Sequence, residues 1–534
     1  MEEQYTNVET GILSLKTAGG ILGYQKAKHL LNRCMFGVRH SEINFIKDKT
    51  ATEAVDYLLT YPTAPLPLPL GVQSTDLEVP VGQTWVNTKY NGTYNSQRLY
   101  SYRGWWTGRM MKQSLSLVEK MVLFWHNHFV IETDTVTNIN FNYRYNLVLY
   151  NHALGNFKTL TEEITSNVGM LTYLDGVRNK VGSPNENYAR ELLELFTIGK
   201  GPLIAPGNYT NYSEYDIQQA AKVLTGWRTN STTDTSYFVT GEHDKTKKIF
   251  SEIFENQFIE NKEADEYKHL IALIFQKKEV ARFIVRKLYR WFVYYDISAS
   301  VEQNIIEPLA DIFYSSGCEI KTVLKALLTS EHFFDQNYWG CMIKNPLELT
   351  VGIYRSLEVD QPADSVPVSQ YSFWNTVFSQ ASLQNLTLGN PPDVAGWTAW
   401  YLPPLYSEIW INSATLPQRA AFIKLATETG VTPSGSSTKV VMDPFKAAYL
   451  ATDPSNLSDL VQTLAGLLLP ITPSVEMITG LKEIVNPGLP DTVWATEWNK
   501  YVTNPGDATQ KKRISDKLLA LVKKITSLAE FQLI

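Results

Sequence analysis

The feature that most constrains the fold is a helical period that recurs along nearly the whole chain. Apolar residues return every three or four positions in most segments, whereas the strict alternation of a half-buried strand is scarce. Such a pattern predicts helices that each bury one apolar face against other helices. Hydrophobic residues make up 44% of the 534 residues and charged residues 19%, as in globular chains. We therefore expect a mainly α-helical protein with a large multi-helical body.

Short stretches without this period predict loops and divide the chain. The run at 61–69 contains four prolines, which exclude a helix and favour an extended loop. A short β-hairpin is expected at 70–95, and the Thr-rich stretch at 229–240 predicts either a loop or a hairpin. Residues 387–410, rich in Pro, Gly and Trp, predict an irregular but packed segment. Residues 432–437, rich in Ser and Gly, are typical of a linker.

This linker predicts two parts. We expect a main helical body over residues 1–430 and a helical C-terminal subdomain over residues 431–534. A single long helix is expected at about 108–129 within the main body, because its apolar residues keep one period throughout.

Charge and targeting signals narrow the class of protein. The formal net charge of −6 argues against a protein that coats nucleic acid. The chain begins with acidic residues and shows no basic segment followed by an apolar run, so we expect no export signal and a cytoplasmic location. The most apolar stretch, 464–471, is too short to span a bilayer, so no membrane insertion is expected. Three distant cysteines predict neither a disulfide framework nor a thiolate zinc site.

The segment from Ser183 to Gly199 predicts a helix with clear end signals. Ser183 suits the N-cap, Pro184 the first helical position and Glu186 the third, which together form a capping box. Gly199 suits the C-terminal end of the same helix. Glu186 therefore has a structural role in this interpretation.

One face of this helix carries the strongest candidates for chemistry. Asn187, Arg190, Glu191 and Glu194 share the side opposite to the apolar face. Two interpretations stay open: a solvated stripe with a weak Arg190–Glu194 pair, or the wall of a cleft. In a cleft, Glu191 and Glu194 would act as acid, base or metal ligands, and Arg190 would orient an anionic group.

A pair of histidines lies in the run Phe124-Trp125-His126-Asn127-His128-Phe129. In an extended segment His126 and His128 would point the same way, whereas on a helix they diverge by about 200°. With Glu191 as a third ligand they would form a three-ligand site with an open position for a divalent metal such as zinc or iron. The alternative is two hydrogen-bonded histidines in an aromatic core.

Two further groups are weaker candidates. His243 and Asp244 are either metal ligands or part of a polar turn. Arg282, Arg286 and Arg290 form a row along one predicted helix, either paired with acids or binding a carboxylate or phosphate. No Walker loop, Rossmann fingerprint, Gly-x-Ser-x-Gly elbow or His-Glu-x-x-His helix is present, which disfavours nucleotide hydrolysis, dinucleotide redox chemistry and serine-esterase chemistry.

Short motifs spread along the chain match one family in order. They are His29–Arg33, Phe124–Phe129, His152–Phe157, Leu174–Gly176, Asn185–Gly199, Leu224–Trp227, His243–Asp244, Lys287–Arg290, Lys344–Pro346, Pro391–Trp397, Trp410–Ser413 and Ala529–Leu533. In this order they resemble the bacterial "domain of unknown function 1800" family, from about residue 25 to the end of the sequence. The resemblance supplies no catalytic residues, because the function of that family is unknown.

The resemblance also implies a partner and a setting. Genes of that family often lie beside genes of the "domain of unknown function 1501" family, which resembles sulfatases and alkaline phosphatases and often carries an export signal. This implies a sulfatase-like partner and a periplasmic or envelope location reached by co-export with it. Such a complex needs an exposed apolar patch, for which Trp397, Trp400 and the loop at 62–69 are candidates.

Three functions follow from these observations. The favoured one is a metal-assisted hydrolase of the cell envelope, with His126 and His128 as ligands, Glu191 as third ligand or base, and Arg190 orienting an anionic group. The second is a non-catalytic partner of the sulfatase-like protein. The third is a metal-free glycan hydrolase that acts through Glu191 and Glu194.

Overall fold

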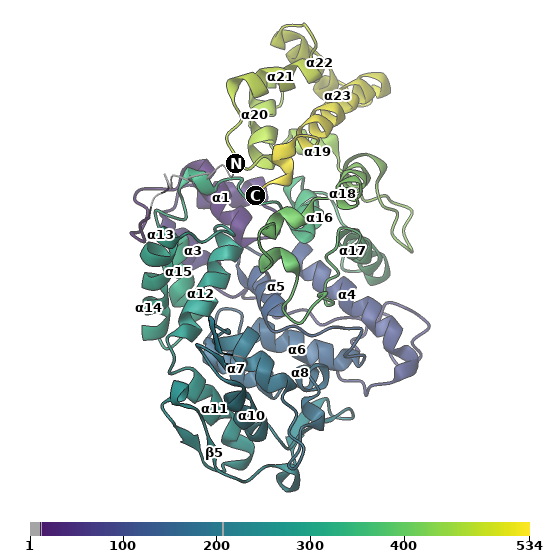
Figure 1. The fold of residues 1–534 in the computed structure, drawn as a ribbon. Coiled ribbons are helices and arrows are strands. Elements are labelled where there is room, and N and C mark those ends of the chain that lie inside the picture. The colour runs from purple at the N-terminus through teal and green to yellow at the C-terminus, as the bar shows by residue number, and fades with distance from the viewer. Residues whose placement is uncertain (1–10, 12, 206–207) are drawn as a thin grey trace.

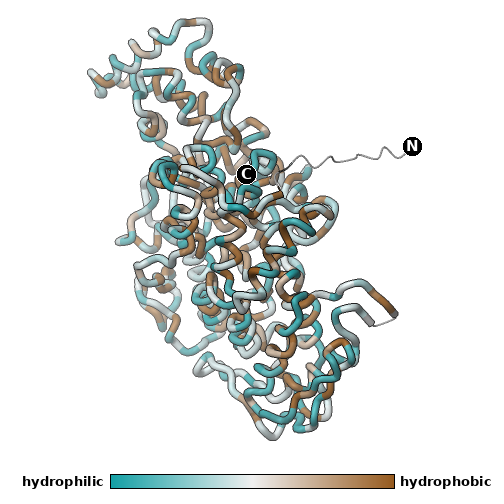
Figure 2. Tube along the Cα trace, turned by 90° about the vertical axis from the view of Figure 1, so that its left-hand side faces the viewer, coloured by the Kyte–Doolittle hydropathy of each residue, from teal (hydrophilic) through white to brown (hydrophobic). Residues whose placement is uncertain are grey.

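The computed structural model describes residues 11, 13–205 and 208–534, and it is mainly α-helical, as the helical period predicts. Figure 1 shows an elongated molecule with the C-terminal helices at its narrow top and β5, α10 and α11 at its base. Figure 2 shows the same outline from the side, with hydrophobic and hydrophilic turns alternating along the helices. One continuous core of buried apolar side chains runs through it.

The helices of the first half of the chain build the N-terminal and central layers. They are α1 (Gly23–Cys34), α2 (His40–Ile46), α3 (Ala51–Leu58), α4 (Asn95–Met111), α5 (Val118–His128), α6 (Ile139–Asn151), α7 (Phe157–Thr165), α8 (Val168–Tyr173), α9 (Asn187–Glu191) and α10 (Glu214–Val223). In Figure 1, α4, α5 and α6 cross the middle of the molecule.

The second half adds two flanks and the top. Its helices are α11 (Glu266–Ile274), α12 (Glu279–Phe292), α13 (Ala299–Val301), α14 (Glu307–Ser315), α15 (Ile320–Leu328), α16 (Pro346–Ser356), α17 (Pro367–Ser382), α18 (Thr415–Lys424), α19 (Pro444–Ala448), α20 (Leu457–Leu468), α21 (Val475–Val485), α22 (Asp491–Thr503) and α23 (Ala508–Thr526). Three π-helical segments are η3 (Leu192–Thr197), η7 (Glu302–Ile306) and η11 (Leu425–Thr429). Single 3-10 turns are η1 (Gly92–Tyr94), η2 (Gly176–Arg178), η4 (Thr240–Glu242), η5 (Glu252–Phe254), η6 (Glu263–Asp265), η8 (Gln336–Tyr338), η9 (Thr398–Trp400), η10 (Tyr406–Trp410) and η12 (Ala529–Gln532).

The strands form short antiparallel pairs. They are β1 (Leu203–Ala205) with β2 (Asn208–Tyr209), β3 (Trp227–Asn230) with β4 (Thr235–Phe238), and β5 (Lys248–Ile249) with β6 (Phe258–Ile259). The β3–β4 pair shows that the 229–240 stretch, for which a loop or a hairpin was expected, belongs to a hairpin. The hairpin expected at 70–95 is wrong, because the described chain forms only an isolated bridge there, between Leu70 and Thr84.

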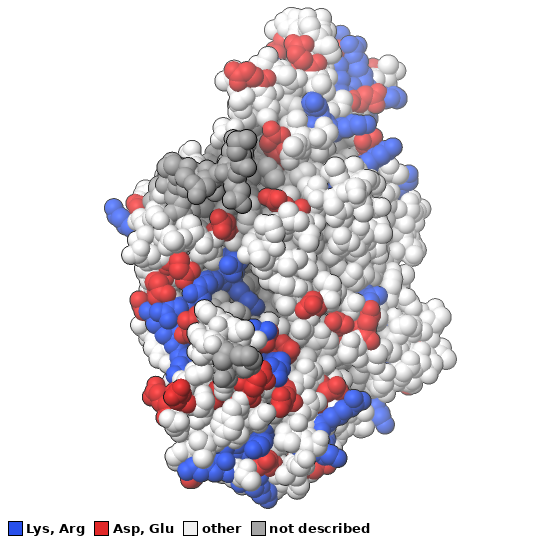
Figure 3. Space-filling view, viewed as in Figure 1, with Lys and Arg blue, Asp and Glu red and all other residues white. Residues whose placement is uncertain are grey.

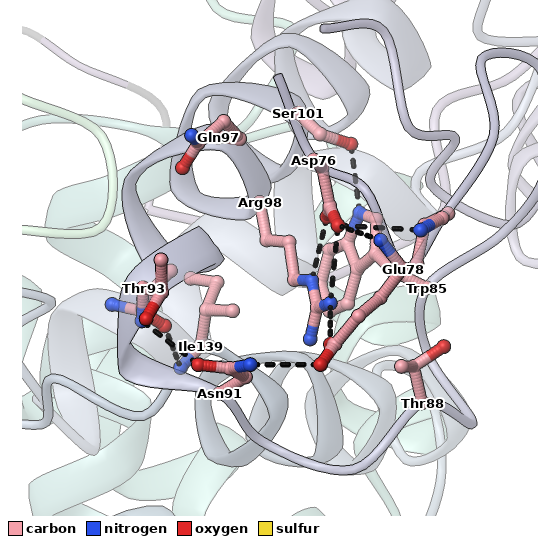
Figure 4. Close-up of polar contacts among 12 residues, drawn as sticks. Asp76, Glu78, Trp85, Thr88, Asn91, Thr93, Gln97, Arg98, Ser101 and Ile139 are labelled. Atoms are coloured by element: carbon pink, nitrogen blue, oxygen red, sulfur yellow. Dashed lines mark hydrogen bonds and ion pairs between the residues drawn. The ribbon is translucent and has the colours of Figure 1, made fainter. Parts of the chain in front are cut away.

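Side chains rather than strand pairing hold the 70–95 segment (Figure 4). The buried Arg98 of α4 donates from Nε to Asp76 Oδ2 over 2.9 Å and from Nη2 to Glu78 Oε2 over 2.7 Å. Asn91 Nδ2 donates to the other oxygen of Glu78 over 2.7 Å. A buried arginine needs such acidic partners. The polar residues of this segment are therefore placed to bind Arg98 and do not follow the alternating polar and apolar pattern of a strand. The segment is therefore a fixed part of the body.

The single helix expected at 108–129 is also wrong, because α4 ends at Met111 and α5 begins at Val118. Between them the chain turns to bond the end of α3: Ser116 Oγ donates to Thr60 O over 2.7 Å, and Leu117 N donates to Leu58 O over 2.9 Å. The helical pattern of apolar residues does not reveal this break, because the residues of both helices beside it are buried.

The C-terminal helices pack on one another and join the body through α1. The amine of Lys28, which is buried, donates to Gly466 O over 2.7 Å and to Leu469 O over 2.6 Å, at the end of α20. Cations suit this position because the last carbonyls of a helix lack partners. The domain boundary at 431 stays a prediction.

Within the described ranges, no helix combines the length and the apolar composition that crossing a membrane requires.

Candidate functional site

The last turn of α5 is the point where several of the sequence motifs meet. Trp125 Nε1 donates to Ala153 O over 3.0 Å, which ties α5 to the segment that follows α6. Asn127 Oδ1 accepts a 2.8 Å hydrogen bond from the backbone N–H of Trp397, in the 391–397 loop. Gly396 makes this approach possible, since a Cβ there would lie 2.4 Å from Asn127 Oδ1. The motifs therefore converge in space.

His128 connects the last turn of α5 to two other segments. Its Nε2 lies 3.0 Å from Phe196 O, and its Nδ1 lies 3.1 Å from the amine of Lys287. Because a carbonyl can only accept, Nε2 carries the proton and Nδ1 accepts from Lys287. Burial, with the nearby Lys287 charge, holds the pKa of His128 well below its ordinary value. The ring is neutral, and both nitrogens are occupied.

His126 points to a different part of the core. The Tyr145 hydroxyl donates to Phe129 O, so it accepts from His126 Nδ1 over 3.2 Å. The ring packs between Trp106 and Trp397, at centroid distances of 5.0 and 5.6 Å. Burial lowers the pKa of His126 to about 3, so the ring is neutral. Its Nε2 has no hydrogen-bond partner among the described residues.

The structure does not assemble the metal site expected from His126, His128 and Glu191. The two histidines lie on helical backbone, where side chains two apart diverge, and each ring bonds to its own surroundings. No group of three or more His, Cys, Asp or Glu side chains in the described part of the chain is placed to hold a metal ion. The residues present do not fit the expected zinc or iron ion.

The helix of the 183–199 segment begins later than its end signals suggest. Ser183 forms a bridge with Lys180, and α9 starts at Asn187, whose N–H donates to Asn185 Oδ1 over 2.9 Å. The expected capping box at Ser183 is therefore wrong. Gly199 does end the helix, with a φ of +66°, and the six residues before Ile198 form the π-helical segment η3. Such insertions occur often at functional sites.

Two of the three expected catalytic residues are held by partners. The Arg190 guanidinium binds Glu214 through two hydrogen bonds of 2.7 Å, so it fastens α9 to α10 and is not free to orient an anion. Glu194 forms a 2.5 Å ion pair with Lys200 and accepts a 3.1 Å hydrogen bond from the Tyr212 hydroxyl. Arg190 and Glu194 are thus both ion-paired with residues of opposite charge.

Glu191 is the exception. Its half-buried carboxyl has no hydrogen bond or ion pair with another described residue. Burial, together with the negative charges of Glu194 and Asp393, raises the pKa of Glu191 to about 7, although the positive charges of Arg190 and Lys200 act in the opposite direction. A carboxyl with this pKa is partly protonated at neutral pH.

Residues from two other segments complete the surroundings of Glu191. Asp393, Glu132 and Glu191 all raise the pKa of Tyr173 in addition to burial, and the Tyr173 hydroxyl donates to Glu132 Oε1 over 2.7 Å. We call Glu191, Glu194, Asp393, Tyr173 and Glu132 the Glu191 site. Sequence patterns identified the first two but not the others, although Asp393 lies within the Pro391–Trp397 motif.

The His243 motif is structural. His243 Nε2 lies 2.9 Å from Glu266 Oε2, and Lys248 is ion-paired with the same carboxylate, with all three side chains fully buried. The next residue, Asp244, accepts hydrogen bonds from Thr246 in a polar turn. This network therefore matches the polar-turn interpretation rather than a ligand site.

The arginine row of α12 is mostly paired with acids. Arg282 bonds to Glu307, and Arg286 bonds to Glu302. Arg290 is an exception that is considered below.

The apolar patch expected at Trp397 is wrong, since only 2% of that residue is exposed. Trp400 is half-buried, with its ring 4.3 Å from that of Trp291. The loop at 62–69 is more open, and Leu68 is 44% exposed.

Comparison with known proteins places the chain in a family without giving it a function. Residues 29–533 match the family model described as "Protein of unknown function (DUF1800)". Searches of curated proteins and of solved structures found no match. Because the family model spans almost all of the sequence, the chain belongs to the DUF1800 family.

Proposed function

We propose that this protein is a hydrolase in which Glu191 transfers the proton in the reaction. The observation that carries the proposal is the isolation of this carboxyl. It is half-buried, unpaired among the described residues and placed near further acidic side chains. A fold has no structural use for such a group, because the cost of burying it is not offset by a hydrogen bond or an ion pair.

The pKa of Glu191 suits general acid–base catalysis. A proton-transferring group works best when its pKa lies close to the working pH, since both forms are then available. The value of about 7 has the physical causes found in catalytic carboxyls, namely burial and neighbouring negative charge. Burial here is incomplete, so the carboxyl remains within reach of a substrate.

A second carboxylate on a separate segment supports glycoside hydrolysis. Two acidic groups must flank a glycosidic bond, one as acid and one as base or nucleophile. Glu194 suits this less well, because it lies on the same helix as Glu191 and is held by Lys200 and Tyr212. Asp393 comes from another segment and is exposed, so we assign it the second role.

The charge of the site supports the same substrate class. Asp393 and Glu132, which no described cation pairs with, add negative charge beside Glu191, which disfavours phosphate and sulfate esters and favours neutral or cationic substrates. A glycan meets this condition. The sulfatase-like partner and the envelope location stay predictions.

The direct test is hydrolysis of a panel of chromogenic glycosides. We expect the wild-type protein to cleave at least one of them, and Glu191→Gln to lower its kcat about 100-fold or more with little change in KM. Glu186→Gln is the matched control, because Glu186 lies at the start of the same helix and is 40% exposed with only a 3.4 Å pair to Arg190. Activity that survives Glu191→Gln contradicts the assignment of the residue, and the absence of cleavage across the panel contradicts the substrate class.

A further inference from the structure

Arg290 differs from the other arginines of its row. Arg282 and Arg286 each bind a glutamate, whereas Arg290 donates only from its Nε, to Tyr295 O over 3.2 Å, and its guanidinium lies over the Tyr406 ring at 5.7 Å from the centroid. Its two terminal NH₂ groups have no hydrogen-bond partner in the part of the chain that the structure describes. Figure 3 shows basic side chains gathered where Figure 1 draws α12, and Arg290 is the one arginine of the row that no described acid neutralises.

Arg290 also lines a small cavity that has unmatched hydrogen-bonding groups in its wall. The cavity has a volume of about 20 Å³, enough for one small polar group. Trp291 Nε1 and Ser407 Oγ belong to residues that line it, and neither has a partner among the described residues. Trp291 is only 5% exposed and Ser407 only 7%. An indole N–H can only donate, and a buried donor without an acceptor is costly.

The acidic side chain beside this cavity is already neutralised. Glu348 lines the cavity, but its carboxylate is ion-paired with the buried Lys120 and accepts a 2.8 Å hydrogen bond from the backbone N–H of Asn345. The donors left without a described partner at this cavity are therefore the Trp291 N–H and the two terminal NH₂ groups of Arg290.

We propose that Arg290, Trp291 and Ser407 form a binding site for the oxyanion of a small ligand, such as a phosphate, sulfate or carboxylate group. The planar guanidinium binds two oxygens of such a group at once, which an ammonium cannot do. One oxygen enters the cavity and accepts from the indole N–H and the hydroxyl. The rings of Trp400 and Tyr406, which line the same cavity, flank the rest of the ligand.

This site is separate from the Glu191 site in both charge and residues. The Glu191 site is acidic and suits neutral substrates, whereas the site at Arg290 is basic. The two proposals therefore stand or fall independently.

The test is isothermal titration of the purified chain with inorganic phosphate, sulfate and acetate at constant ionic strength. We expect at least one of these probes to bind, and the one that binds identifies the chemical class. Trp291→Phe removes the indole N–H and leaves a smaller aromatic ring, and we expect this variant and Arg290→Gln each to weaken binding about tenfold. Arg282→Gln is the control, because Arg282 lies on the same helix and is paired with Glu307; it should bind the probe as the wild type does.

Two results would overturn the site. One is that none of the three probes binds the wild-type chain. The other is that the probe binds Trp291→Phe and Arg290→Gln as tightly as the wild type. Unchanged thermal unfolding of Trp291→Phe and of Arg290→Gln excludes misfolding as the cause of lost binding.

Discussion

The histidines of α5 and the carboxyl of Glu191 are both polar groups in motifs of the same family, yet their surroundings differ. His128 is 2% exposed, and both of its nitrogens are bonded to protein atoms. Glu191 is half-buried and is bonded to no described group. A group whose hydrogen bonds are satisfied inside the protein stabilises the fold, whereas an unsatisfied group at an accessible position is available for chemistry.

The largest effect is expected where the histidine is most integrated. His128→Ala removes a buried ring and one of the two acceptors of the Lys287 amine, so the free energy of unfolding should fall by about 4 kcal/mol. Urea unfolding followed by tryptophan fluorescence measures this. His152→Ala, at a half-buried histidine in the motif 152–157, should cost less than about 1 kcal/mol. Equal costs would show that His128 is not a structural link.

A smaller loss is expected at the contact between α5 and the 391–397 loop. Gly396→Ala forces a Cβ to within 2.5 Å of Asn127 O at a φ of +98°, so we expect a loss of about 3 kcal/mol. Gly182 has a similar φ of +82°, but a Cβ there meets nothing within 4 Å. Gly182→Ala therefore measures the backbone strain alone, about 1–2 kcal/mol. If the two variants lose the same stability in thermal unfolding, the close approach to Asn127 is not important.

Sequence patterns predict the fold class well because burial of one helix face is a local property. The period of 3.6 places Leu192, Leu193 and Phe196 in the core, and all three are buried. Helix boundaries are less predictable where a distant group decides them. Ser183 is a residue type typical of an N-cap, but it forms a β-bridge with Lys180, so the helix begins only after it.

The candidate site, like the helix boundaries, could be predicted from the sequence only in part. The face of Arg190, Glu191 and Glu194 could be predicted from spacing, but which of the three stays unpaired depends on Glu214, Lys200 and Tyr212. These partners lie up to 24 residues away in sequence, and Asp393 lies much further along the chain. No local pattern carries that information.

The smallest expected effect is the pH dependence of the free energy of unfolding that Glu191 causes, and its direction can be predicted. The pKa of Glu191 is about 7 in the folded chain against an ordinary value of 4.5. The folded state therefore holds a proton that the unfolded state has released between these pH values. The stability that this proton provides is complete below about pH 4.5 and is lost as the pH rises through 7. Glu191→Gln has no such loss, whereas Glu194→Gln loses the ion pair with Lys200 and should be less stable than wild type at pH 8.

The measurement that tests the isolation of Glu191 most directly is the free energy of unfolding of Glu191→Gln and wild type from pH 4 to pH 8. We predict that the variant is more stable at pH 8, by about 1 kcal/mol once solvent screening of a half-exposed group is included. The difference should shrink as the pH falls and vanish near pH 4.5. A variant that is less stable at pH 8, or a difference that does not change with pH, would show that Glu191 is an ordinary paired carboxylate and would remove the basis for its catalytic role.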